Sequence, residues 1–297
     1  MKKILCIFLL LLSGAVHAEL NIFACEPEWA ALAKELAGNK VDIYTATTAL
    51  QDPHQIQARP SLIARARRAQ LVVCTGAELE IGWLPIILRE SANPDIAPGK
   101  PGNFEAAHFV TMLELPTHLD RAEGDVHAAG NPHIQTDARN YLPIAKALSA
   151  RLTELDPANA AFYQTRLQTF RLTWQAALAR WEKQAAPLKR QPILVQHTAF
   201  PYLNNWLGLQ QVAALEPKPG MEPSAAHLAK VMEQLQQHPV RMVIRAAYQS
   251  AKPSEWIAEH AHIPAVELPF SVGGTDGAKD LFGLFDDTIT RLLAGMK

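Results

Sequence analysis

Twice along this chain of 297 residues, short apolar runs alternate with longer amphipathic stretches, and this pattern constrains the fold more than any other feature. Short apolar runs are typical of buried strands, and the stretches between them have the periodicity of helices. In the first series the runs and stretches are 20–24, 29–36, 41–44, 60–68, 71–74, 83–88 and 109–113. In the second they are 193–196, 201–207, 209–214, 225–236, 240–244, 253–260, 265–268 and 279–293. This alternation predicts an α/β fold of two lobes, each with a four-stranded parallel sheet flanked by helices.

Between the two series, residues 136–187 have a helical pattern almost throughout. The pattern breaks once, at Asp156-Pro157, where proline suits the first turn of a new helix and Asp156 can cap it. The second piece carries aromatic residues at helical spacing over roughly 30 residues, or about 45 Å. We therefore expect a long, rigid helix that joins the lobes. The expected division is an N-terminal lobe (19–135), a helical connector (136–187) and a C-terminal lobe (188–297).

The first eighteen residues have the organisation of a signal peptide. Lys2 and Lys3 precede an apolar stretch, 4–12, and Val16-His17-Ala18 is typical of a cleavage site. We expect cleavage after Ala18 and export to the periplasm. Because Glu19 would follow the cut, the mature chain would lack the N-terminal cysteine of a lipoprotein and would not be lipid-anchored.

The charge of the chain limits its possible partners. A formal net charge of -1, with 19% charged residues, provides no basic surface for nucleic acid or an anionic membrane. We therefore expect a small ligand or a protein partner, and a monomer.

Two cysteines follow the predicted signal peptide, Cys25 and Cys74, each at the end of an expected strand. In an oxidising compartment, a disulfide between neighbouring strand ends is the expected arrangement. Two free buried thiols, or a pair of thiolate metal ligands, are the alternatives. Neither cysteine has a further cysteine or a histidine at ligand spacing.

Four dispersed residues form the candidate site: His54, His133, His197 and Asp276. Each lies close to proline or glycine in an expected strand-to-helix connection, where parallel sheets bind their ligands. Three imidazoles and one carboxylate are a ligand set for tetrahedral zinc, with metal to nitrogen distances of about 2.0–2.1 Å. Two of the four belong to each half of the chain, so a shared site must lie between the lobes. The alternative role of Asp276 is to cap the helix expected at 279–293.

Three segments carry a family resemblance: Asp52-Pro53-His54, Gly130-Asn131-Pro132-His133-Ile134 and His197-Thr198-Ala199-Phe200-Pro201-Tyr202. They resemble the zinc- and manganese-type substrate-binding proteins of bacterial ABC importers, in order and spacing along the whole mature chain. The resemblance implies two α/β lobes joined by a rigid helix, with one metal ion in the cleft. It also implies a permease subunit in the inner membrane as partner.

The resemblance favours zinc, because manganese-selective members typically have a carboxylate where this chain has His197. Manganese or another divalent metal is the alternative cargo. A further alternative is that the chain is a metal-buffering protein or an adhesin that works without a transporter. A zinc hydrolase needs an open coordination position and a general base, whereas four protein ligands would close this site. We therefore expect no enzymatic activity.

Two further groups of residues concern the same site. The loop 116–132 contains His118, Asp120, Asp125 and His127, where zinc-type relatives often carry a histidine- and acid-rich insertion. It is either an auxiliary site that accepts zinc from solution or from a periplasmic donor protein, or a solvated loop. Arg245 stands where many relatives have a Glu-Pro-Gln segment. We expect it to pair with Asp276 or Glu216 and so to hold a metal ligand in place. The alternative is that Arg245 marks a distinct subfamily with different release behaviour.

Overall fold

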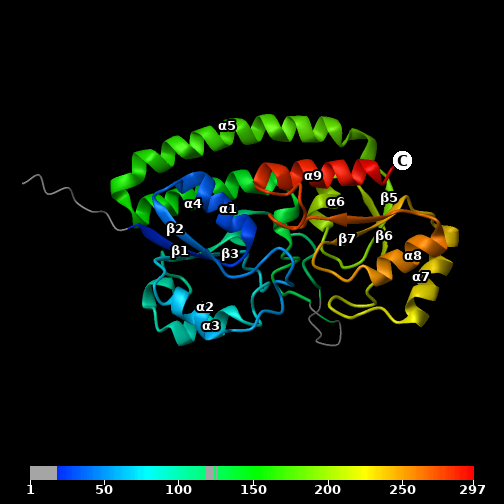
Figure 1. The fold of residues 1–297 in the computed structure, drawn as a ribbon, viewed down its shortest axis with the longest axis horizontal. Coiled ribbons are helices and arrows are strands. Elements are labelled where there is room, and N and C mark those ends of the chain that lie inside the picture. The colour runs from blue at the N-terminus through cyan, green and yellow to red at the C-terminus, as the bar shows by residue number, and fades with distance from the viewer. Residues whose placement is uncertain (1–18, 118–123, 125) are drawn as a thin grey trace, which may run out of the picture.

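The computed structural model describes residues 19–117, 124 and 126–297 (Figure 1). The expected signal peptide and the residues His118, Asp120 and Asp125 lie outside the described residues. Two lobes lie side by side, and one long helix runs along both of them (Figure 1). Among the described residues, no helix is both long and apolar enough to cross a membrane.

The N-terminal lobe is built on a parallel sheet with the strand order β2-β1-β3-β4. Its strands are β1 (Leu20–Ala24), β2 (Val41–Thr45), β3 (Leu71–Cys74) and β4 (Asn103–Glu105). Its helices are α1 (Pro27–Ala37), α2 (Pro60–Ala66) and α3 (Leu84–Ser91), with the 3-10 helices η1 (Pro94–Ile96) and η2 (Ala106–Phe109). A proline in the first turn begins each α-helix of this lobe, which fits its fixed φ angle.

The C-terminal lobe repeats this topology, with the strand order β6-β5-β7-β8. Its strands are β5 (Pro192–Val195), β6 (Gln210–Ala214), β7 (Met242–Ala246) and β8 (Ala265–Leu268). Its helices are α6 (Pro201–Leu207), α7 (Ala225–Gln237), α8 (Lys252–Ala261) and α9 (Leu281–Ala294). The predicted fold class is therefore confirmed. In both sheets the order of strands along the chain reverses at the first strand, which is where α/β sheets bind ligands.

One predicted strand is wrong. The apolar run 109–113 does not form the fourth strand of the N-terminal lobe, because that strand is β4, which is only three residues long. Phe109 instead ends η2, and its ring stacks on Phe104 with a centroid distance of 4.9 Å. Gly102 permits the close approach of β4, since a Cβ there would lie 2.4 Å from the carbonyl oxygen of Asp95.

The connector consists of α4 (Tyr141–Leu155), η6 (Pro157–Asn159) and α5 (Ala160–Gln184), preceded by η4 (Ile134–Thr136) and η5 (Ala138–Asn140) and followed by η7 (Ala186–Leu188). The predicted break at Pro157 is present, but Asp156 makes no capping hydrogen bond to the backbone there. Its carboxylate accepts hydrogen bonds from the side chains of Asn159 and Tyr163. Helix α5 has 25 residues, shorter than the predicted piece, and so is about 37 Å long.

A single hydrophobic core extends through both lobes and the connector. It includes Ile22 of β1, Ile244 of β7 and Trp174 of α5, all nearly fully buried. The Trp174 ring lies 5.2 Å from that of Tyr141 in α4 and 5.6 Å from that of Phe285 in α9. Separate, smaller cores lie beneath α2 and α3 in one lobe and beneath α7 and α8 in the other. The two lobes are therefore joined by shared packing as well as by the chain.

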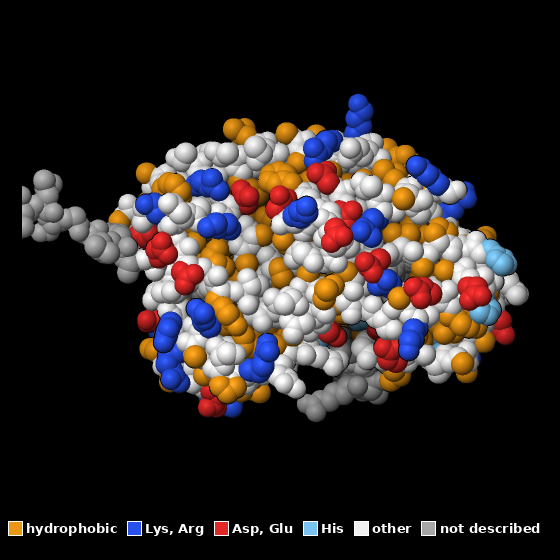
Figure 2. Space-filling view, viewed as in Figure 1, with side chains coloured by type: hydrophobic (Ala, Val, Ile, Leu, Met, Phe, Trp, Pro, Cys, Tyr) orange, Lys and Arg blue, Asp and Glu red, His pale blue; other side chains and the backbone are white. Residues whose placement is uncertain are grey.

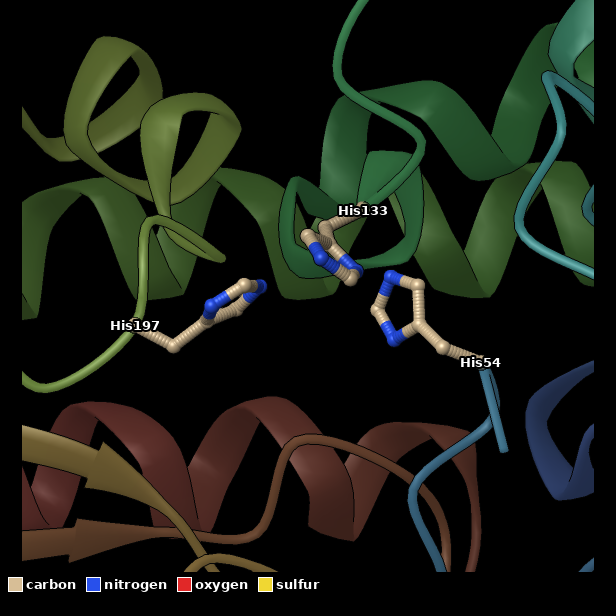
Figure 3. Close-up of side chains that lie close together, drawn as sticks. All are labelled: His54, His133 and His197. Carbon is tan, nitrogen blue, oxygen red and sulfur yellow. The ribbon is translucent and has the colours of Figure 1, made fainter. Parts of the chain in front are cut away.

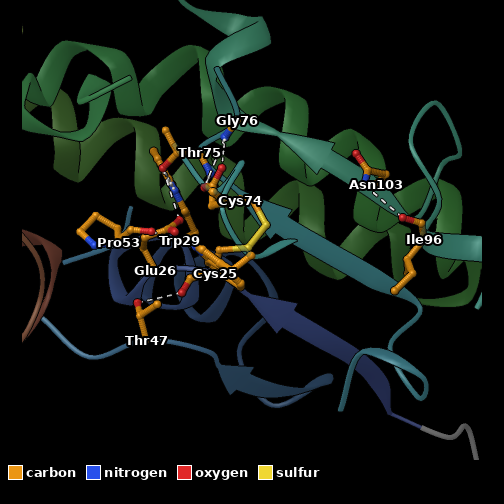
Figure 4. The surroundings of a disulfide bond; sticks show 12 residues. Cys25, Glu26, Trp29, Thr47, Pro53, Cys74, Thr75, Gly76, Ile96 and Asn103 are labelled. Carbon is orange, nitrogen blue, oxygen red and sulfur yellow. Dashed lines mark hydrogen bonds between the residues drawn. A yellow bond between two sulfur atoms is a disulfide. The ribbon is translucent and has the colours of Figure 1, made fainter. Parts of the chain in front are cut away.

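Cys25 and Cys74 form a disulfide between the ends of β1 and β3, as expected (Figure 4). The carboxylate of Glu80 lies within 4.8 Å of both cysteine sulfur atoms, and Glu26, which follows Cys25, and Glu28 are also buried. Burial raises the pKa of Glu28 and that of Glu80 to about 7, and burial together with Glu80 raises the pKa of Glu26 well above its usual range. Burial in this region of the core therefore favours the protonated form of all three carboxyl groups.

Candidate metal centre

Three histidines meet between the lobes (Figure 3). His54 comes from the connection between β2 and α2, His133 from the segment between η2 and α4, and His197 from the residues directly after β5. One ring nitrogen of each lies within 4.8 Å of one ring nitrogen of the other two. A tetrahedral zinc ion holds its ligand nitrogens about 3.4 Å apart. Small side-chain movements would therefore suffice for all three to bind one ion.

Two of these histidines sit in the same kind of local turn. In Asp52-Pro53-His54, the Asp52 carboxylate accepts a hydrogen bond from the backbone N–H of His54 at 3.0 Å. In Asn131-Pro132-His133, the Asn131 side-chain oxygen accepts one from the N–H of His133 at 3.1 Å. Aspartate and asparagine favour such turns, and the intervening proline restricts the backbone further. The sequence thus fixes each histidine locally.

Carboxylates orient two of the three imidazoles. The Nδ1 atom of His54 lies 2.8 Å from Asp52, and that of His197 lies 2.7 Å from Glu216. Each contact leaves Nε2 of the ring for a metal, which is the usual arrangement behind a histidine ligand. Burial raises the pKa of Asp52, but the hydrogen bonds and charge of His54 outweigh it, and the net pKa is lowered.

The third imidazole, that of His133, is almost fully buried. Burial, and then the nearby histidines, hold its pKa well below the usual range, so the ring is neutral and able to bind a cation. Nε2 of His54 and Nδ1 of His133 are buried atoms with no hydrogen-bond partner among the described residues. Buried polar atoms are rarely left unpaired. Both unpaired nitrogens belong to the histidine cluster, and a metal ion bound there would be their missing partner.

A polar cleft of about 380 Å³ opens beside the histidines. It is lined by His54, His197 and side chains from both lobes, among them the acidic residues Asp52, Glu216 and Glu222. Figure 2 shows a hollow between the lobes, at the lower side of the molecule. Basic and acidic side chains are interspersed over the rest of the visible face. The carboxylates make the cleft attractive to a cation.

The structure does not bring Asp276 into this cluster. Its side chain is exposed, and it is not among the described residues whose ligand atoms group with the three histidines. Nor does it cap α9, because Asp280 does so by accepting a hydrogen bond from the N–H of Gly283 at 2.8 Å. The alternative role of Asp276 as a helix cap is therefore wrong.

The remaining predicted residues have mixed outcomes. His127, in the described part of the loop, stacks on His54 with ring centroids 5.4 Å apart, so the loop does reach the site. Arg245 forms its ion pair with Glu267 on the neighbouring strand β8, and not with Asp276 or Glu216 as we expected. Its guanidinium also donates to the carbonyl of Gln249, a residue of the cleft wall. The orienting role we gave to Arg245 belongs instead to Asp52 and Glu216.

Comparison with known proteins gives the family. The model for periplasmic zinc-uptake complex component A (ZnuA) matches residues 22–295. This chain belongs to that family. The chain is 25% identical to the high-affinity zinc uptake system protein ZnuA of Bacillus subtilis over 229 residues, which cover 76% of this chain and 70% of the relative. It is 21% identical to the manganese ABC transporter substrate-binding lipoprotein PsaA of Streptococcus mitis over 286 residues, or 89% and 88% of the two chains.

Solved structures agree on the fold. A crystal structure of ZnuA matches with a TM-score of 0.78 at 22% identity, over 94% of this chain and all of that one. A cadmium-bound periplasmic metal binding protein from Candidatus Liberibacter asiaticus matches with a TM-score of 0.76 at 16% identity, with the same coverage. The chain is thus a metal-binding protein of the substrate-binding class of ABC transporters, a class that serves transport and not catalysis.

Proposed function

We propose that this protein captures one Zn²⁺ ion in the periplasm and delivers it to a permease of an inner-membrane ABC importer. The observation that carries the proposal is the all-nitrogen cluster of His54, His133 and His197. Zinc favours imidazole, whereas manganese favours oxygen ligands. The carboxylates behind His54 and His197 supply compensating charge without occupying the coordination positions.

We propose Asp276 as the fourth ligand of bound zinc. Phe270, the second residue of its loop, has its ring centroid 5.4 Å from that of His133, so the loop begins beside the site. The loop between β8 and α9 would have to move, because the Asp276 side chain is exposed. His127 would act earlier, as an auxiliary group that meets the ion at the mouth of the cleft.

Metal binding tests the first part of the proposal. Metal-free mature protein would be dialysed to equilibrium against zinc or manganese, and bound metal measured by elemental analysis. We expect about one tightly bound zinc per chain and weaker manganese binding. His133→Ala should abolish tight zinc binding, whereas His238→Ala, at the exposed end of α7, should leave it unchanged. Preference for manganese in the unaltered protein would contradict the proposal.

Growth of the source bacterium tests delivery. Deletion of the gene should impair growth in medium depleted of zinc by a chelator, and added zinc should restore it. The gene for the His133→Ala variant should not complement the deletion. Normal growth of the deletion strain under zinc depletion, with a defect only under manganese depletion, would identify manganese as the cargo.

A further inference from the structure

Asn131 connects the segments that carry His133 and His197. Its side-chain oxygen accepts the hydrogen bond from the N–H of His133, and its Nδ2 donates to the carbonyl of Thr198 at 2.8 Å. Thr198 directly follows His197, and it belongs to the other lobe. One short, rigid side chain therefore bridges the backbones that hold two of the three imidazoles.

Hydrogen bonds also hold the backbone of Asn131 in place. Its carbonyl accepts a hydrogen bond from the hydroxyl of Tyr202 at 2.8 Å, and the same hydroxyl accepts one from the N–H of Leu113 at 3.0 Å. The N–H of Asn131 donates to the carbonyl of Leu113 at 2.8 Å. Tyr202 lies in α6 and is buried. Tyr202 of the C-terminal lobe is therefore hydrogen-bonded at both ends of the loop that contains His127, to Leu113 at one end and to Asn131 at the other.

Asp52 shows why position 131 is an asparagine. Both residues accept the N–H of the histidine two positions later, so either side chain can form the turn. An aspartate at 131, however, has no N–H to donate. Its second oxygen would face the carbonyl of Thr198 and the carboxylate of Glu114, both of which now accept hydrogen bonds from Nδ2 of Asn131.

We propose that Asn131 is a positioning residue that sets the spacing of His133 and His197 across the lobe interface, with the hydroxyl of Tyr202 holding it in place. This inference rests on the proposed metal-binding function and extends it to a residue that touches no ion. Loss of the bridge would let the two lobes present their histidines at variable spacing. Zinc affinity would fall while the fold persisted.

The test compares two chemically equivalent substitutions. Asn131→Asp keeps the turn and removes the bridge. Asn93→Asp is the matched control, because Asn93 precedes a proline, accepts the N–H of Asp95 at 3.1 Å and donates to the carbonyls of Ala66 and Ala69, all away from the histidines. We expect zinc affinity to fall about 10–100-fold in Asn131→Asp, the usual range for residues that orient metal ligands, and to change less than about twofold in Asn93→Asp.

Cobalt(II) absorption provides a readout that a general loss of stability would not change. The d–d bands of bound cobalt report coordination geometry, so Asn131→Asp should alter the spectrum per bound ion, and Asn93→Asp should not. Tyr202→Phe removes only the hydroxyl that holds Asn131 and should also weaken zinc binding. This variant tests the proposal if Asn131→Asp does not fold. Zinc affinity within about twofold of the unaltered protein in either bridge variant, or equal losses in Asn131→Asp and Asn93→Asp, would overturn the proposal. Failure of the unaltered protein to bind metal would instead refute the proposed function.

Discussion

The fourth metal ligand can be identified by single substitutions. Asp276 is exposed and His127 stacks on His54, so the two candidates approach the site from different loops. If Asp276 moves in to bind zinc, Asp276→Ala should weaken zinc binding by at least about tenfold, and His127→Ala by less. Competition with a chromophoric chelator would measure both affinities. The reverse order of effects would assign the fourth position to the loop that contains His127.

A second prediction at this scale concerns Glu28, whose buried carboxyl accepts a hydrogen bond from Ser271 of the other lobe. Its pKa in the folded protein is about 7, against 4.5 for the free group, so the folded state binds the proton more tightly. The contribution of Glu28 to the stability of the metal-free protein should therefore fall as the pH rises from 4.5 through 7, because the folded state must then hold a buried charge. Glu28→Gln mimics the protonated form.

Thermal unfolding at pH 5 and pH 8 checks this prediction. Glu28→Gln should unfold at a higher temperature than the unaltered protein at pH 8 and at a similar temperature at pH 5. The control, Glu233→Gln on the exposed face of α7, should be neutral at both pH values. A Glu28→Gln variant that is less stable at pH 8 would mean that the ionised carboxylate is preferred.

Sequence reasoning found the residues whose role is fixed locally and missed those that depend on strand order. His54 and His133 directly follow prolines, and Pro201 stands four positions after His197. The same local pattern could have revealed Asp52, two positions before His54. Glu216 is nineteen positions from His197 and reaches it only because β6 pairs with β5. The partner of Arg245 has the same origin, since Arg245 and Glu267 are paired residues of β7 and β8. Sheet register is not visible in one sequence.

At the scale of elements, α5 is stabilised by its aromatic side chains, with Trp174 at the centre. The ring is fully buried, and its Nε1 donates to the carbonyl of Ala138 at 2.8 Å. Trp174→Ala should lower the free energy of unfolding by about 3–5 kcal/mol, as expected for loss of a large buried ring. Leu172→Ala, at a position 69% exposed on the same helix, should cost less than about 0.5 kcal/mol.

Denaturant unfolding of the metal-free variants would measure both values. A loss below about 1 kcal/mol for Trp174→Ala would show that α5 contributes little to the shared core.

Elements with strong periodicity were predictable and short ones were not. Seven of the eight strands coincide with predicted apolar runs. The central strands β1, β3, β5 and β7 are mainly buried, as expected inside a parallel sheet covered by helices. The exception, β4, has three residues at a sheet edge and carries no pattern long enough to detect. The more apolar run 109–113 follows β4, and we wrongly predicted this run as the fourth strand. Helix α5 was overestimated because its helical pattern continues into the 3-10 helix η7. The proposed lobe boundaries stay a prediction.

At the scale of the whole molecule, the shared core and α5 should limit relative movement of the lobes. Hinge closure needs a flexible connection, whereas here packed helices span both lobes (Figure 1). Spin labels at the exposed positions Arg68 and Gln237, one in each lobe, would report the distance between lobes. We expect the mean distance to change by less than about 2 Å on zinc binding. A larger change would indicate that the lobes close as rigid bodies.

The two sheets have the same strand order, and the residues that form this scaffold differ from the residues that would bind the metal. The core that holds the lobes together is set by strands and helices, while every residue of the histidine cluster stands in a connection between them. A substitution at such a position can change ligand chemistry at little cost to folding. Evolution could therefore exchange one metal for another within an unchanged scaffold, which accounts for relatives that bear the names of zinc and manganese at 21–25% identity.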